Sequence, residues 1–127
     1  MSIPFNPSSG LIVVTAILEG STGAFKLSLV LDTGARVTVI RDSVLIQAGY
    51  NPALATQKAS MTTASHTIKV PRLPVTRMSS LGHEKLNFLV AAHTLLPTAP
   101  YDGLLGLDFF RGKILNIDFL IGLIDVL

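Results

Sequence analysis

Short apolar runs, rich in β-branched residues and separated by glycine, proline and small polar residues, dominate the sequence. Runs of this length with such flanks are typical of strands rather than buried helices. We expect strands over residues 11–18, 25–31, 37–40, 86–91, 114–119 and 121–127, with a turn around Gly122. Residues 11–18 (LIVVTAIL) are apolar enough to predict a buried strand, followed by a turn over residues 19–23. The chain has 127 residues and no repeat, so we expect one mostly β domain over residues 1–127.

One or two short helices are expected between these strands. Asp42 or Ser43 can cap a helix over residues 44–48, and Gly49 supplies its stop. Residues 102–110 (DGLLGLDFF) predict a buried strand, a glycine break and a short helix.

Residues 58–75 predict a hairpin with a polar tip over residues 62–67. Pro71 and Pro74 have no backbone N–H to donate, which restricts the second arm to a sheet edge or a bulge. A loop is expected over residues 93–100, which contain two prolines.

Composition narrows the function classes. The absence of cysteine excludes disulfides, thiolate catalysis and cysteine metal sites, and it fits a reducing compartment. Ten Lys and Arg residues are scattered against eight Asp and Glu, and with few aromatics this disfavours a nucleic-acid surface. We see no membrane span and no signal-peptide pattern, so a cytoplasmic protein is the default expectation. The three histidines have no metal-ligand spacing, and we expect no metal and no cofactor.

The segment that carries chemistry is residues 29–40, LVLDTGARVTVI. An ionisable Asp32 directly after three apolar strand residues is costly unless its carboxylate is hydrogen-bonded or used. Gly34 allows the backbone to approach closely or adopt positive φ, and Thr33 offers a hydroxyl. The tripeptide Asp-Thr/Ser-Gly alone would occur by chance in roughly one chain in twenty of this size, so its context decides.

In that context the chain resembles the retropepsin-like aspartic proteases, single-lobed relatives of pepsin. Asp32-Thr33-Gly34-Ala35 follows apolar residues, and a hydroxyl residue, Thr38, stands three positions after Ala35. The family's late apolar–apolar–Gly strand is matched by residues 104–106. The predicted hairpin lies between the two motifs, where this family has its flap. The resemblance implies a closed, mostly β, acid-protease-like barrel that is active as a homodimer.

The chain contains no second Asp-Thr/Ser-Gly, so an active site of this type needs Asp32 from two copies across a two-fold axis. The paired acids would share a proton, one acting as general base on water while the other polarises the scissile carbonyl. By resemblance, Thr33 would brace the two turns, Gly34 would offer its carbonyl to the substrate, and Ala35 stands where two-lobed relatives usually have serine.

Further site residues follow more loosely from the resemblance. Val30, Val39 and Leu104 sit where the family lines its groove with apolar side chains, although each could be ordinary core. The flap tip contains Thr63, Ala64, Ser65 and His66, where His66 either contacts substrate or is an exposed loop histidine.

Two positions depart from the viral pattern, which has Asp after the Ala and Arg after the late Gly. Arg36 and Leu107 stand there instead, so that ion pair cannot form. Arg36 either pairs with Asp108 or is solvated, with Asp108 capping the helix. The flap tip also lacks glycine.

These features predict an aspartic endopeptidase that cuts extended polypeptides flanked by apolar residues. The alternative is an inactive module of the same fold that binds peptides or only dimerises. Residues 121–127 either pack across the dimer axis or pair within their own subunit.

Overall fold

The computed structural model describes residues 1–62, 65–94 and 98–127. Its strands are β1 (Ser2–Pro4), β2 (Val13–Gly20), β3 (Gly23–Leu31), β4 (Val39–Arg41), β5 (Gln57–Thr62), β6 (Thr67–Ser80), β7 (His83–His93), β8 (Gly103–Leu105), β9 (Leu115–Asp118) and β10 (Leu123–Val126). Its helices are α1 (Asp42–Gln47), a 3-10 turn η1 (Pro52–Leu54) and α2 (Leu107–Phe110).

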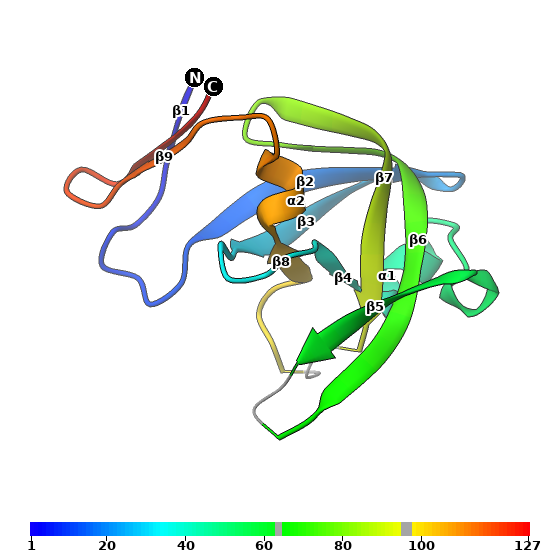
Figure 1. The fold of residues 1–127 in the computed structure, drawn as a ribbon. Helices are drawn as coiled ribbons and strands as arrows, with labels where there is room; N and C mark the ends of the chain where they lie inside the picture. Colours follow the sequence, from blue (N-terminus) through cyan, green and yellow to red (C-terminus); the bar gives the residue numbers. More distant parts are fainter. Residues whose placement is uncertain (63–64, 95–97) are drawn as a thin grey trace.

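Six strands close into a barrel (Figure 1). They follow the order β2-β3-β8-β4-β7-β6, and β6 pairs back onto β2. Strand β5 pairs with the far end of β6, so the β5–β6 hairpin extends away from the barrel. The expected mostly β, closed barrel with two short helices is therefore confirmed.

Residues 11–18 were expected to form a buried strand, but strand β2 is buried on one face only. It begins at Val13, and its residues alternate between exposed and buried. Val13 is 47% exposed, whereas Leu18 is fully buried. The prediction of a buried strand is wrong because a barrel wall has an outer face that meets solvent, whichever residues occupy it.

The two prolines of β6 lie where that strand has a neighbour on one side only. Pro71 is paired with Lys58 of β5, before the pairing with β7 begins. Pro74 is paired with Leu89 of β7, beyond the end of β5. Each proline therefore lies where β6 is locally at an edge of the sheet, as expected for this arm.

Helix α1 forms as expected but without the expected cap. Arg41 occupies the N-cap position and no side chain caps the helix, because β4 leads directly into it. The Asp42 carboxylate accepts instead from the backbone N–H of Ser43 and from the hydroxyl of Thr94. Gly49 follows the helix with φ +99°, which confirms its role as the stop.

The terminal strands form a separate sheet in the order β1-β10-β9, and the two chain ends lie side by side (Figure 1). Strand β10 is its central strand and pairs on both sides with its own chain. Of the two roles open to residues 121–127, pairing within the subunit is the one the structure has. A partner copy therefore cannot pair with β10 through the backbone in this conformation.

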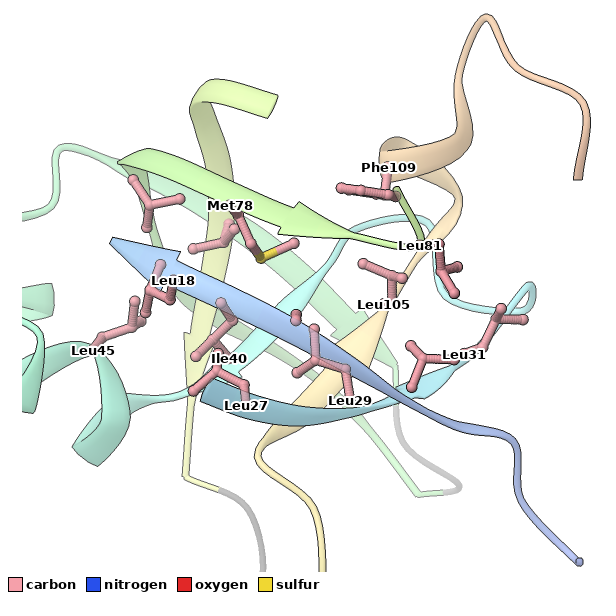
Figure 2. Packing of buried hydrophobic residues seen from close by; sticks show 14 of the residues in the cluster. Leu18, Leu27, Leu29, Leu31, Ile40, Leu45, Met78, Leu81, Leu105 and Phe109 are labelled. Atoms are coloured by element: carbon pink, nitrogen blue, oxygen red, sulfur yellow. The ribbon is translucent and has the colours of Figure 1, made fainter. Parts of the chain in front are cut away.

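The interior of the barrel is filled by aliphatic side chains from nearly every strand (Figure 2). Leu18, Leu29, Ile40 and Leu105 are fully buried there. Phe109 of α2 closes the barrel and packs edge-on against Phe88 and Phe110. This packing fixes α2 against the barrel, and α2 in turn contacts the Asp32 turn. None of the helices in the described part of the chain has the length and apolar character needed to cross a membrane.

Candidate active site

Asp32 lies at the point where β3 leaves the barrel and the chain turns sharply. Its backbone N–H donates to the carbonyl of Leu105 at 3.0 Å, which anchors the turn to β8. The Gly34 N–H donates to Oδ1 of Asp32 at 2.9 Å, and the Ala35 N–H donates to the Asp32 carbonyl at 3.1 Å. These bonds hold the carboxylate in one orientation, while the residue itself remains half-buried.

The late glycine motif packs directly against this turn. The Leu107 N–H donates to the Ala35 carbonyl at 2.8 Å. A Cβ atom on Gly106 would lie 2.7 Å from the carbonyl group of Val37 and 2.8 Å from the Ala35 oxygen. Only glycine therefore permits α2 to approach the turn this closely.

A buried polar network joins the two motifs. Thr38, which is fully buried, donates its hydroxyl to Oδ1 of Asp108 at 2.7 Å and its N–H to Oδ2 at 2.9 Å. The same hydroxyl oxygen accepts from the Gly106 N–H at 3.1 Å. Thr38 thus satisfies three groups that burial would otherwise leave without partners.

This network rules out both expected roles of Asp108, the ion pair with Arg36 and the helix cap, whereas the alternative of a solvated Arg36 fits the structure. Asp108 lies in the first turn of α2, but no side chain caps that helix. In the described part of the chain no ion pair joins Asp108 to Arg36, which is exposed. The carboxylate is occupied by Thr38, which satisfies it with two hydrogen bonds from the buried side.

A cavity of about 540 Å³ opens in front of the Asp32 carboxylate. One wall is the turn itself with parts of β4 and β8, and the other is the β5–β6 hairpin. The described lining residues are Asp32, Gly34, Ala35, Arg36, Val37, Val39, Lys58, Ala59, Ser60, Met61, Thr62, Arg72 and Leu104.

The cavity brings together five of the residues predicted from sequence and omits others. Asp32, Gly34, Ala35, Val39 and Leu104 line it.

Val30 is buried and does not line this cavity, which fits the ordinary core alternative at that position. Thr33 is exposed and also lies outside the lining. Ser65 and His66 are exposed, bond to each other at 2.9 Å, and are not among the lining residues. Thr63 and Ala64 fall outside the described residues.

Comparisons with known proteins identify the family of this chain and a solved structure of the same fold. Residues 19–112 match the model of a family described as "gag-polyprotein putative aspartyl protease", a span that includes both the Asp32 turn and Gly106. The chain belongs to this retropepsin-like aspartic protease family. A retropepsin-like aspartic protease from Rickettsia conorii has the same fold, with a TM-score of 0.71 and 19% identity over 100% of this chain and 97% of that one. No curated protein matches the sequence.

Within this retropepsin-like chain, sequence reasoning missed the basic lining of the cavity. Arg36, Lys58 and Arg72 all line it, and Asp32 is the one acidic residue among the described lining residues. A signal was present for Arg72, since it follows Ile68 and Val70 at the spacing that places alternate residues on one face of a strand. Scattered in sequence, the three cations converge only because the hairpin folds over the Asp32 turn.

Proposed function

We propose that this chain is an aspartic endopeptidase that acts on extended polypeptides as a homodimer of one domain, residues 1–127. The observation that carries the proposal is the Asp32 carboxylate, held by the Gly34 N–H and facing a cavity of about 540 Å³. Aspartic proteases use two carboxylates that share a proton. The described lining holds only one, so a second copy would supply the other across a two-fold axis.

The proposed chemistry follows from that pair. The ionised Asp32 takes a proton from a water molecule, whose oxygen bonds to the scissile carbonyl carbon. The protonated Asp32 of the second copy donates its proton to the carbonyl oxygen. The C–N bond then breaks as the amide nitrogen takes the proton from Asp32, while one hydroxyl group of the tetrahedral intermediate returns its proton to the second carboxylate. This releases an acid and an amine and leaves the pair with one shared proton again.

The neighbours of Asp32 have supporting roles in this proposal. Thr33 braces one turn against the other, Gly34 presents its carbonyl to the substrate backbone, and Ala35 links the turn to α2. The β5–β6 hairpin acts as the flap, and Val39 and Leu104 contribute apolar groove surface. Cytoplasmic localisation is part of the proposal, since a chain without cysteine suits a reducing compartment.

For the contact between copies we propose the tip of the β9–β10 hairpin. Phe119, Leu120 and Ile121 follow one another there and are 63%, 90% and 61% exposed. Three consecutive exposed large apolar side chains favour burial against another surface. A second copy is the occupant that the incomplete carboxylate pair calls for.

The test compares the wild type with Asp32→Asn on a diverse peptide mixture over about pH 3–8. Asparagine preserves the shape of the side chain but cannot act as a general base. We expect acid-favoured cuts by the wild type and none by the variant. Cleavage that survives Asp32→Asn would refute the role of Asp32.

The second candidate is a module of the same fold that binds peptides without cutting them. The observation in its favour is the pair Arg36 and Leu107, which replaces the ion pair of the viral enzymes. A dimeric wild-type protein that binds peptides but cleaves none at any pH would establish this alternative.

A further inference from the structure

We propose that Arg72 makes this cleft select peptides that carry a carboxylate side chain, glutamate or aspartate, close to the cut. The inference rests on the proposed function and adds a specificity that apolar groove walls alone do not predict.

Arg72 lies on the inner face of the flap hairpin. It is paired with Ala91 of β7 and with Gln57 of β5. Ala91 is in turn paired with Val39, and Val39 with Leu104. Because paired residues of neighbouring strands project to the same face, Arg72 continues the row of side chains that forms the apolar floor of the cleft.

The Arg72 guanidinium has an unmet hydrogen-bonding requirement. Its Nε is buried and has no hydrogen-bond partner among the described residues. A buried donor without a partner carries a desolvation cost, so this guanidinium is incompletely satisfied by the described part of its own chain. A carboxylate suits this site best, because its two oxygens match the planar fork of arginine and accept strong, charge-assisted bonds.

The chain has no side-chain carboxylate of its own to spare for this role. Apart from Asp32, each of its acidic side chains already has a partner. Glu19 and Glu84 pair with Arg77, Asp42 accepts from Ser43 and Thr94, Asp102 from Ser28, Asp108 from Thr38, Asp118 from Leu120 and Ile121, and Asp125 from Ser2.

A second copy would bring the same engaged carboxylates and its own Asp32, which the proposed function commits to the shared carboxyl pair. The acid that Arg72 binds therefore comes from the substrate.

Two further cations strengthen the preference. Arg36 and Lys58 line the same cavity, are exposed, and form none of the ion pairs found in the described part of the chain. Together with Arg72 they give the described lining of this cavity three basic residues and one acidic residue, Asp32. A concave site lined mainly by one sign of charge concentrates ligands of the opposite sign.

The experiment measures kcat/KM on matched peptides with two central apolar residues and either Glu or Gln at each flanking position in turn. At about pH 6, where a substrate glutamate is ionised, we expect the wild type to prefer Glu over Gln by about tenfold or more at one position. Arg72→Gln should reduce this ratio to about one, and Arg72→Lys should retain part of it. The matched control is Arg77→Gln on the same strand, which lies outside the cleft and should keep the wild-type ratio.

Lowering the pH provides a second readout that a purely structural arginine would not affect. Below about pH 4 the substrate glutamate is protonated, and the preference should vanish for the wild type as well. A wild-type Glu/Gln ratio near one at every position at pH 6, or a ratio unchanged by Arg72→Gln, overturns the inference.

Failure of the inference is distinguishable from failure of the proposed function. If the wild type cleaves some peptides without a Glu preference, the protease stands and the role of Arg72 falls. If it cleaves none, binding of the same labelled Glu and Gln peptides, followed by fluorescence anisotropy, still decides. Tighter binding of the Glu peptide that is lost in Arg72→Gln supports the inference, and equal binding overturns it.

Discussion

Replacing Thr38 with valine should destabilise the protein far more than a single hydroxyl group suggests. Valine has nearly the same shape, so the change removes the oxygen and little else. That oxygen donates to Asp108 at 2.7 Å and accepts from the Gly106 N–H at 3.1 Å, in a side chain that is fully buried. Thr38→Val therefore removes one hydrogen bond to the Asp108 carboxylate and leaves the buried Gly106 N–H without its acceptor.

The magnitude follows from these two losses. A hydrogen bond to a charged group contributes about 1.5–3 kcal/mol, and an unsatisfied buried donor costs about 1–3 kcal/mol. Together they predict a loss of about 2.5–6 kcal/mol in the free energy of unfolding. Small proteins have only about 5–15 kcal/mol in total, so the variant should be close to the limit of stable folding.

The assay is urea unfolding followed by circular dichroism, at one fixed protein concentration because a dimer's stability depends on it. With a slope of about 2 kcal/mol per molar urea, the midpoint should fall by about 2 M. Thr38→Ser keeps the hydroxyl and should lose only about 1 kcal/mol for the missing methyl. Thr15→Val, at an exposed position, should change stability by about 0.5 kcal/mol or less. If Thr38→Val is no less stable than Thr38→Ser, the network does not stabilise the fold as argued.

Three further predictions concern the turn, the active-site pair and the dimer contact. Gly106→Ala should unfold or inactivate the protein, because the new Cβ would lie 2.7 Å from the Val37 backbone. Its control is Gly10→Ala, which has open space around it and should behave like the wild type in thermal unfolding and peptide cleavage. One part wild type is mixed with three parts Asp32→Asn under conditions in which subunits exchange. Because only a quarter of the wild-type chains then meet another wild-type chain, about a quarter of the activity of the same amount of wild type alone should remain. Undiminished activity would show that one chain suffices. Leu120→Ser should weaken self-association, measured by analytical ultracentrifugation, and should barely change the fold because this side chain is 90% exposed. Unchanged self-association would show that the hairpin tip is not part of the contact between copies.

Local sequence patterns were sufficient for the parts of the fold that depend on neighbouring residues. β3 becomes buried toward Asp32 as its apolar run predicts, and the break at Gly106 before α2 lies where expected. The tight turn between β6 and β7 was missed because Leu81 adopts φ +53°, a conformation that leucine rarely takes. Leu81 is held in this conformation by the pairing of β6 with β7 on either side of the turn.

Contacts distant in sequence could not be predicted in the same way. Asp108 was expected either to pair with Arg36 or to cap its helix, yet it accepts two hydrogen bonds from Thr38. Both partners were visible as motif residues, but their pairing depends on how closely α2 approaches the turn. The central place of β10 in its sheet likewise depends on β1, whose three residues carry little strand signal of their own.

The two walls of the cleft are determined by different kinds of interaction, and this separates chemistry from specificity. The Asp32 wall is fixed by backbone contacts so close that Gly103 and Gly106 admit no side chain, since a Cβ on Gly103 would meet the Val39 oxygen at 2.0 Å. A substitution there disturbs the carboxylate itself. The flap wall is built from side chains on β5 and β6, among them Lys58 and Arg72, and the backbone pairing beneath them does not depend on their identity. Under the proposed function, substrate preference could therefore change on the flap wall while the geometry around Asp32 stays the same. Sequence motifs fix the Asp32 wall through its glycines, but they do not fix the side chains of the hairpin that would contact the peptide.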